Sequence, residues 1–487
     1  MKLLNTLSIL LLLFISFSCS NSEKKSKEYE NEVRIDEYLI SLMDLHNIPG
    51  LALAIVEGDK IVYENYFGNA SIEDSTLVDK NTLFRVFSTT KLITATGIFQ
   101  LIEDGELKVE DDLSKYLDGL PREWQQIKIK NLLSHSSGLP DIMRYKSTLS
   151  DEELMEKLLQ EKMQFVTGYQ FSYNQTNYWF LAQIIEKITG NQFEEYILKN
   201  QFDGSFNGVL FSSNALEGIP NRATRYYYSD RNKKFVKDTN NSGIRGHSGN
   251  GLNITLSNFI KWDKQLKADV LIGPEVKSAM WSPFAFTNNF KYQKDDFLHG
   301  WGRYYVNGLE SYGFSGGNST AYRFFPKSNT TIMLLSNGYQ TPAFDIIIND
   351  VARIVLPELK GRGLTLEEDI MDLVLNDEFD RAAQLLKKLN QENPNSRFDN
   401  LKSNFNGVGN SHVWNDNSKK ALQVFKMYAD AYPNSWIASA GLAETYEIEG
   451  DTLNALKYYE KALRLNEKNE YHYNEGMINS INKLKNE

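Results

Sequence analysis

Cysteine is almost absent from this chain, because Cys19 is the only one among 487 residues. The six histidines are scattered, and none of them lies in a His-Glu-x-x-His pattern or beside a cysteine cluster. Groupings of those kinds hold most transition metals in proteins. The sequence therefore predicts no metal site and no cofactor.

Positive charge is also scarce, since 53 Lys and Arg stand against 63 Asp and Glu. The net charge of −10 comes with no Lys/Arg run that could form a basic patch. We therefore expect no nucleic-acid partner. Aromatic residues are abundant, with 26 Tyr and 27 Phe, and a chain of this length and composition is globular with a large core.

The long apolar run of the chain is at its start, from Leu3 to Phe17, and is shorter than a typical membrane span. It ends in Ser16-Phe17-Ser18-Cys19, which resembles a bacterial lipoprotein signal, although Phe17 departs from the usual small residue. This implies a signal peptide (1–18), a lipid-modified Cys19, a polar tether (19–32) and export to the cell envelope with a membrane anchor. An ordinary secretory signal or an uncleaved anchor is the alternative.

Residues 33–357 mix strand and helix patterns. Ile48–Ser71 predicts a hairpin, and 304–306, 322–325 and 331–335 predict strands. Strands at both ends of the segment imply an antiparallel sheet closed by distant parts of the chain. Helices are predicted after Ser88, at 151–161, from about 175 to Gly190, around Phe259 and Trp262, and at 346–356.

Residues 358–487 read as helix after helix. Ala382, Ala421 and Ala455 mark equivalent points, 39 and 34 residues apart. The last unit follows the tetratricopeptide pattern, whose period is about 34, at Leu442, Tyr446, Gly450, Ala455, Tyr459 and Ala462. We predict an all-α domain of tetratricopeptide-like repeats; a generic helical bundle is the alternative.

The residues that carry chemistry begin with Ser88 and Lys91, spaced so that both lie on one face of a helix start. A desolvated lysine can be neutral enough to take the proton of a serine nucleophile, and helix N–H groups favour the developing charge. The same Ser-x-x-Lys pattern recurs at Ser22/Lys25 and Ser480/Lys483, where it carries no such context. The alternative, non-catalytic interpretation is that Ser88 caps a helix and Lys91 lies at the surface.

The segment 33–357 resembles the serine beta-lactamase and penicillin-binding-protein-like hydrolases, in the branch of class C beta-lactamases, D-aminopeptidases and esterases. The motifs that carry the resemblance are Ile48-Pro49-Gly50, Phe84 to Lys91, Leu132 to Pro140 and Tyr173-Asn174-Gln175. It implies an α/β (α+β) domain with an antiparallel sheet flanked by helices and a helical subdomain. It also implies that Ser88 is acylated, Lys91 is its proton partner and Tyr173 is the general base or proton relay.

Two departures from the family pattern concern the substrate. Gln175 stands where the family has asparagine, and its amide reaches one methylene further. The third motif, usually Lys-Thr-Gly or His-x-Gly, is here Phe314-Ser315-Gly316, which lacks the cation for a substrate carboxylate. Gly317 is expected to supply an oxyanion-hole N–H beside that of Ser88. We therefore expect ester or amide hydrolysis, D-amino-acid peptides included, to exceed beta-lactam hydrolysis.

Three further residues and two alternative functions complete the sequence-based interpretation. His135 is interpreted as structural, and Arg245 and His247 as candidates for the pocket. The leading hypothesis is an exported serine hydrolase acting on a small molecule or peptide, with a repeat domain that contacts a partner protein. One alternative is an inactive relative that binds without turnover. The other is a scaffold whose functional centre is the repeat domain.

Overall fold

The computed structural model describes residues 30–204, 207–287, 297–338, 344–394, 396, 398–467 and 473–486. The predicted signal peptide, Cys19 and most of the tether lie outside these residues. Residues 30–46 are helical, so the last three residues assigned to the tether belong to a helix. Among the described residues, no helix combines the length and apolar character that crossing a membrane requires.

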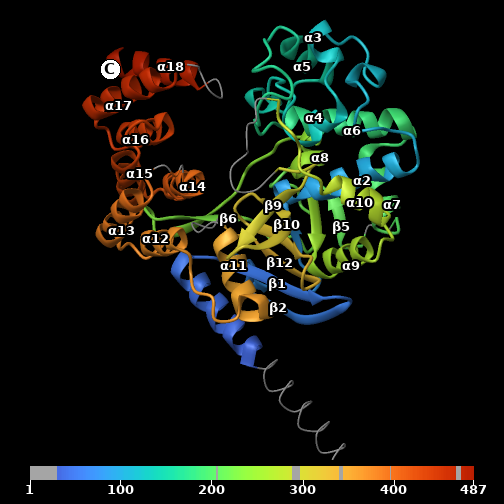
Figure 1. Ribbon diagram of the computed structural model, residues 1–487, viewed down its shortest axis with the longest axis horizontal. Helices are drawn as coiled ribbons and strands as arrows, with labels where there is room; N and C mark the ends of the chain where they lie inside the picture. The colour runs from blue at the N-terminus through green and yellow to red at the C-terminus, as the bar shows by residue number, and fades with distance from the viewer. Residues whose placement is uncertain are drawn as a thin grey trace, which may run out of the picture.

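Figure 1 shows two parts, which we call the N-terminal region (30–359) and the C-terminal helical region (366–486). The N-terminal region is built on a seven-stranded antiparallel sheet of order β3-β2-β1-β12-β11-β10-β9. These strands are β1 Gly50–Glu57, β2 Lys60–Ser71, β3 Thr76–Leu77, β9 Gly302–Val306, β10 Leu309–Gly316, β11 Thr320–Phe325 and β12 Thr330–Ser336.

This sheet confirms the predicted hairpin of β1 and β2 and the closure by distant parts of the chain, because β1 pairs antiparallel with β12. The predicted strands near 304, 322 and 331 are β9, β11 and β12. The strand β10, which carries the Phe314 motif, was not predicted.

Both faces of the sheet are covered, because successive side chains of β1 point to opposite faces and are apolar on both. Leu51, Leu53 and Ile55 pack with helix 30–46 and with α11 Phe344–Val355. Ala52, Ala54 and Val56 face the larger core on the other side. That core includes α2 Thr90–Glu103 and α9 Leu256–Lys267, so the Ser88 segment rests on the sheet.

The remaining elements form the helical subdomain and two small sheets, β4-β8-β5 and β6-β7. The helix predicted from about 175 is α6, and Gly190 ends it with a positive φ of 69°. The bounds are α3 Arg122–Gln125, α4 Ile129–Leu133, α5 Asp151–Leu158, α6 Gln175–Thr189, α7 Phe193–Gln201, α8 His247–Asn250, α10 Pro274–Met280, β4 Leu83–Arg85, β5 Val209–Phe211, β6 Tyr226–Ser229, β7 Lys234–Lys237 and β8 Leu252–Thr255.

The C-terminal helical region is all-α over its described residues. Ala382, Ala421 and Ala455 are fully buried, and each is the fourth residue of a 14-residue helix. This regularity is consistent with the predicted repeats. The bounds are α12 Leu366–Leu375, α13 Phe379–Glu392, α14 Asp399–Trp414, α15 Ser418–Ala431, α16 Trp436–Ile448, α17 Thr452–Leu465 and α18 Asn474–Asn486.

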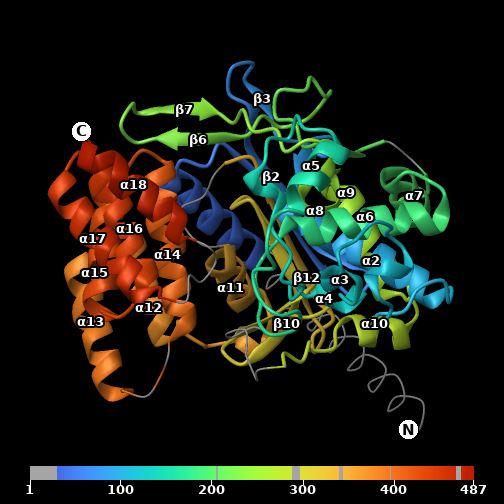
Figure 2. The same ribbon diagram turned by 90° about the horizontal axis from the view of Figure 1, so that it is seen from above.

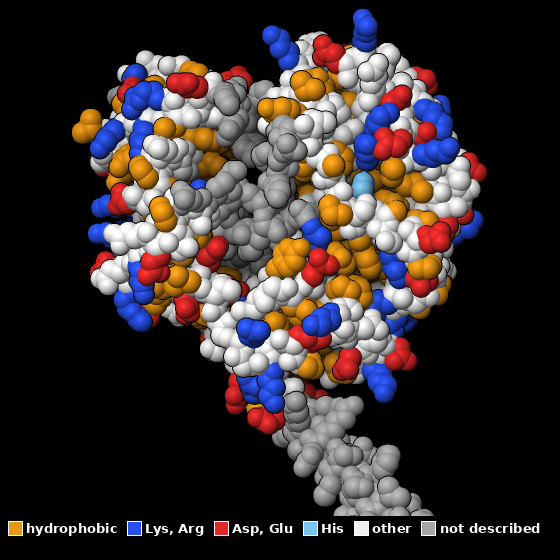
Figure 3. Space-filling view, viewed as in Figure 1, with side chains coloured by type: hydrophobic (Ala, Val, Ile, Leu, Met, Phe, Trp, Pro, Cys, Tyr) orange, Lys and Arg blue, Asp and Glu red, His pale blue; other side chains and the backbone are white. Residues whose placement is uncertain are grey.

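The two regions are joined by hydrogen bonds as well as by the chain. The β6–β7 hairpin reaches the C-terminal helical region (Figure 2), where the backbone N–H of Asp230 donates to the carbonyl of Asn415 at 2.8 Å. Ser229 donates to Asp416 at 2.7 Å, and Asn417 donates to Asp230 at 2.9 Å. These contacts fix how the helices face the rest of the molecule. On the face drawn in Figure 3, basic and acidic side chains are interspersed over both regions.

Candidate active site

Ser88 lies in a single 3-10 turn, Phe87–Thr89, that leads directly into α2. Thr320 of β11 holds this turn, because its hydroxyl donates to the Val86 carbonyl at 2.9 Å and lies 3.1 Å from the Thr89 hydroxyl. Phe87 has a left-handed backbone, with φ 47°, which is a strained conformation for an aromatic residue. The turn therefore presents Ser88, half-buried, at a fixed place above the sheet.

Lys91, one turn further on, is fully buried. Burial lowers its pKa to about 7, and Asp141 opposes that shift. Its Nζ donates to the Gly249 carbonyl at 2.8 Å and to Gln175 Oε1 at 3.3 Å. At a pKa near 7 a substantial fraction of this amine is neutral at neutral pH, as the sequence-based hypothesis of a proton acceptor requires.

Tyr173 contacts both Ser88 and Lys91. Its hydroxyl donates to Ser88 Oγ at 2.7 Å, and its ring lies 4.7 Å from Lys91 Nζ. The ring is held between Phe314, stacked at 6.3 Å, and His135 at 4.4 Å. The side chain is 39% exposed, so a substrate can reach it. The structure thus brings the three residues proposed for catalysis to one point.

Gln175, the first residue of α6, lies beside these three residues, where its Oε1 accepts the hydrogen bond from Lys91. Its backbone N–H donates to Asp141 Oδ1 at 3.3 Å. Gly249 of α8 closes the site from below, since a Cβ there would collide with Gln175 Oε1 and lie 3.3 Å from Lys91 Nζ. Any larger residue at this position would displace the ends of the Gln175 and Lys91 side chains.

The third motif runs along the end of β10. A Cβ on Gly316 would collide with the Val86 carbonyl and lie 2.9 Å from the Ser88 nitrogen, so the motif backs directly onto the serine turn. Gly317 has φ 56° and lies against the Phe87 ring. The Ser315 hydroxyl accepts a hydrogen bond from Arg323 at 2.8 Å. Phe314 is 9% exposed and faces Tyr173 where the family has its cation.

His135 lies beneath Tyr173 and is fully buried. Its Nδ1 accepts from the Asn174 backbone N–H at 3.1 Å and lies 3.2 Å from the Asn177 amide. Burial, together with the charge of Lys91, holds its pKa well below 6.5, so the ring is neutral. These contacts fit the structural interpretation, with the imidazole fixing the entry to α6.

The other sequence candidates have partners elsewhere. Arg245 forms an ion pair with Asp151, and His247 Nδ1 lies 2.6 Å from Glu194. Lys483 forms an ion pair with Glu447 at 2.9 Å and is 60% exposed, so it lacks the burial of Lys91. Ser22 and Lys25 lie outside the described residues.

Sequence reasoning missed Gly249, Asp141 and Tyr178, the last of which places its ring 4.9 Å from Lys91 Nζ. The signals were present but ambiguous: Gly249 belongs to a Gly-Asn-Gly triplet, and Asp141 follows Leu139-Pro140. No group of His, Cys, Asp or Glu suited to a metal ion occurs among the described residues.

Comparison with known proteins places this geometry in context. The family model for Beta-lactamase matches residues 35–356. The chain is 29% identical over 282 residues to Penicillin-binding protein 4* of Bacillus subtilis (strain 168), covering 54% of this chain and 61% of the relative. It is 30% identical over 185 residues to the putative penicillin-binding protein PbpX of the same strain, covering 38% of this chain and 46% of the relative. The match thus spans less than two thirds of either relative.

Solved structures share the fold. The octameric penicillin-binding protein homologue from Pyrococcus abyssi superposes with a TM-score of 0.59 at 21% identity, covering 70% of this chain and 81% of that one. A D-amino acid amidase from Ochrobactrum anthropi SV3 gives 0.54 at 19% identity, covering 68% and 98%. EstCE1, a hydrolase with promiscuous acyltransferase activity, gives 0.56 at 16% identity, covering 67% and 98%.

Proposed function

Because the chain belongs to the beta-lactamase family of serine hydrolases, we propose that it cleaves ester or amide bonds through an acyl-enzyme on Ser88. The observation that carries this proposal is the contact of 2.7 Å between Tyr173 and Ser88, above a buried Lys91 whose pKa is about 7. The Tyr173 hydroxyl is bonded to Ser88 Oγ and its ring lies 4.7 Å from Lys91 Nζ, so the tyrosine is placed to relay the serine proton toward the lysine.

In the proposed reaction, Ser88 Oγ attacks the substrate carbonyl, and its proton passes through the Tyr173 hydroxyl to neutral Lys91. The backbone N–H groups of Ser88 and Gly317 hold the oxyanion. When the tetrahedral intermediate collapses, the proton returns by the same route to the leaving alcohol or amine. Water then attacks the acyl-Ser88 ester with the same groups acting in the same order.

The substrate class follows from the third motif. Phe314 offers no charge to a substrate carboxylate, and the Arg323 guanidinium is bound to Ser315 and to the Tyr322 carbonyl. A beta-lactam drug, whose carboxylate needs a cation, is therefore a poorer substrate than an uncharged ester or amide. Two solved structures that share the fold are a D-amino acid amidase and a hydrolase with promiscuous acyltransferase activity.

The test is intact-mass spectrometry of the purified protein mixed with an activated ester, a D-alanyl peptide or nitrocefin. We expect an adduct that appears and decays in the wild type and is absent in Ser88→Ala. The compound that forms it names the substrate class. A folded wild type that forms no adduct with any of the three would support instead the inactive, binding relative.

The location and the C-terminal region remain proposals of their own. The sequence before Cys19 supports export and lipid anchoring, which labelled palmitate would test: incorporation is expected in the wild type and lost in Cys19→Ser. The three buried alanines at equivalent helix positions support tetratricopeptide-like repeats. A partner protein for these repeats would be sought by pull-down with and without residues 360–487.

A further inference from the structure

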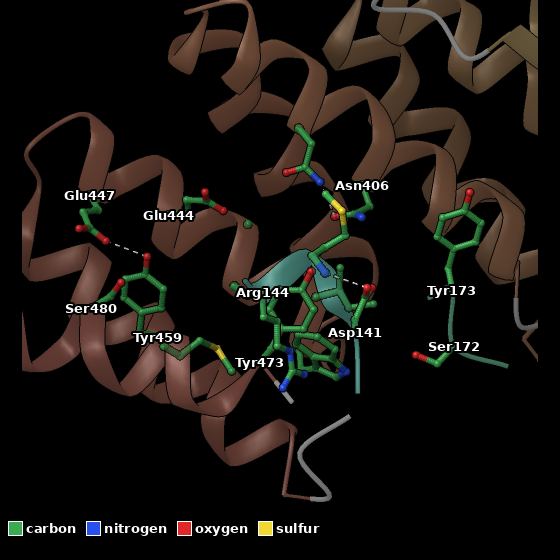
Figure 4. Close-up of a pocket in the computed structure, with 18 of the residues that line it drawn as sticks. Asp141, Arg144, Ser172, Tyr173, Asn406, Glu444, Glu447, Tyr459, Tyr473 and Ser480 are labelled. Atoms are coloured by element: carbon green, nitrogen blue, oxygen red, sulfur yellow. Dashed lines mark hydrogen bonds between the residues drawn. The ribbon is translucent and has the colours of Figure 1, made fainter. Parts of the chain in front are cut away.

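A cavity of about 1200 Å³ lies between the mouth of the candidate active site and the C-terminal helical region. Its N-terminal wall includes Ser172 and Tyr173, the residue that contacts Ser88. Its opposite wall includes Glu444, Glu447 and Tyr459 (Figure 4). Ligand pockets commonly measure about 300–1,000 Å³. The cavity is thus larger than a small acyl group needs, and Tyr173 of the candidate active site lines it.

Helix α16 supplies about half of the residues of the opposite wall. Ile437, Ala440, Gly441 and Glu444 recur at the three- and four-residue spacing that puts side chains on one side of a helix. The small Ala440 adds little bulk in front of the helix, and the absence of a side chain at Gly441 leaves space for the Phe425 ring. The contacts between the β6–β7 hairpin and the turn after α14 hold this face toward the active site.

The described lining carries three carboxylates and two cationic side chains, and Asp141, beside the candidate active site, accepts from the backbone N–H groups of Met143 and Gln175. Glu447 is paired with Lys483 at 2.9 Å and accepts from the Tyr459 hydroxyl at 2.8 Å. Arg144 is paired with Glu161 at 3.1 Å. Glu444 is exposed to the cavity, and no side chain among the described residues forms an ion pair or hydrogen bond with it. The uncompensated charge is negative.

Two other features of the cavity lining indicate which groups the rest of the ligand contains. The amides of Asn406 and Asn410, bonded to each other at 3.2 Å, can offer both a donor and an acceptor to a peptide group. Trp436 and Tyr473, whose rings lie 5.5 Å apart, add an aromatic surface, and such rings attract cations. A chain with amide groups and an ammonium group complements this lining.

We propose that the cavity is an extended substrate site, which takes an ester or amide whose peptide-like chain carries an ammonium group that pairs with Glu444. This rests on the proposed hydrolysis at Ser88 and names its substrate class. The C-terminal helical region then selects substrates instead of serving only as a docking module or a packing cap.

The experiment uses p-nitrophenyl esters whose acyl chains lengthen from acetyl to dodecanoyl, each ending in a methyl or a trimethylammonium group. We expect kcat/KM of the full-length wild type to favour the cationic ester by about fivefold once the chain reaches Glu444, as a partly exposed ion pair allows. Glu444→Gln removes the preference. The matched control Glu392→Gln, an exposed carboxylate of α13 outside the cavity lining, keeps it.

Equal turnover of both series at every length, with no effect of Glu444→Gln, would overturn the substrate site while leaving hydrolysis intact. If no ester is turned over, the proposed hydrolysis fails and calorimetry decides the site separately. Tetra-alanine must then bind the wild type more tightly than its N-acetylated form and lose that advantage in Glu444→Gln. If tetra-alanine does not bind, the ammonium site is overturned. It is also overturned if the cavity binds a chitin oligosaccharide instead, with an affinity that Glu444→Gln leaves unchanged.

Discussion

The Tyr173 hydroxyl donates a 2.7 Å hydrogen bond to Ser88 Oγ, although 85 positions separate the two residues. Tyr173 precedes α6 and Ser88 precedes α2, so the contact exists only because both helices pack in one core. Its chemistry depends on the fold around it, above all on the burial of Lys91 beneath the Tyr173 ring.

The first prediction concerns Tyr173→Phe, which removes the hydroxyl and keeps the ring. We expect kcat to fall about a hundred- to ten-thousandfold, as for the loss of a proton-transfer group. The melting temperature should hardly change, because the side chain is 39% exposed and its ring contacts with Phe314 and His135 remain. Tyr169→Phe, the same change at an exposed tyrosine, is the control. Equal activity of the two variants would remove Tyr173 from the mechanism.

The second prediction is a pH profile set by Lys91. Burial lowers its pKa to about 7, and below that value the amine is an ammonium that cannot accept the Ser88 proton. The rate constant kcat/KM for an uncharged ester should therefore rise with pH through about 7 and level off above it. Rates measured in buffers of constant ionic strength check this. A profile that is flat from about pH 5 to 9 would contradict it.

Part of this site could be predicted from sequence, and the reason differs from residue to residue. Ser88 and Lys91 are candidates from their spacing on a helix start, and the resemblance to the family strengthens that prediction and adds Tyr173. The helix after Ser88 and the β1–β2 hairpin follow from local periodicity, which depends only on neighbours in the chain.

The missed features depend on distant contacts. Strand β10 has period-two burial in its first half, but the buried side there includes Ser311 and Gly313, where a strand pattern calls for large apolar residues. Gly313 is required because a Cβ would collide with the Tyr322 carbonyl of the next strand. Gly249 likewise acts through its carbonyl, 158 positions from Lys91, and a backbone atom leaves no chemical signature in sequence.

The third prediction tests that glycine. Gly249→Ala places a methyl group against Gln175 Oε1 and close to Lys91 Nζ, so both side chains must shift. Because proton transfer is sensitive to displacements of this size, we expect kcat to drop about tenfold or more with a smaller change in KM. Gly218→Ala, where an added Cβ has no neighbour within 4 Å, provides the matched control. Unchanged kinetics in Gly249→Ala would mean that the Lys91 contact is not used.

The fourth prediction concerns stability at acid pH. Burial lowers the pKa of His299 and of His412 to about 4, and it holds that of His135 well below 6.5. Between about pH 6.5 and 5 the unfolded chain takes up protons at these positions and the folded chain does not, so stability falls as the pH falls. Each such histidine contributes a slope of up to about 1.4 kcal/mol per pH unit.

Urea unfolding at several pH values measures that slope. In His299→Phe one buried histidine is gone, while the edge-to-face packing against Phe99 can be kept, so the slope should become shallower by one histidine's share. A wild type whose unfolding free energy stays constant over this pH range would contradict the prediction.

The last prediction concerns Phe314, which stands where the family has its cation. We expect wild-type turnover of nitrocefin, which carries a carboxylate, to be much slower than that of an activated ester. Phe314→Lys should raise kcat/KM for nitrocefin by about fivefold, the share of one partly exposed ion pair, and leave the uncharged ester without such a gain. Steady-state kinetics with both compounds measure this. Comparable nitrocefin and ester turnover in the wild type would refute the need for a cation.

The control for this change is Phe314→Met, which is similar in length to the lysine variant but uncharged. If both variants gain nitrocefin turnover, the gain comes from the removal of the phenyl ring and not from the new charge.

The new ammonium of Phe314→Lys also lies beside the Tyr173 ring, close to Lys91, and a like charge there lowers the pKa of Lys91 further. The pH profile of Phe314→Lys should therefore move to lower pH than that of Phe314→Met, because the neutral amine then persists in more acidic solution.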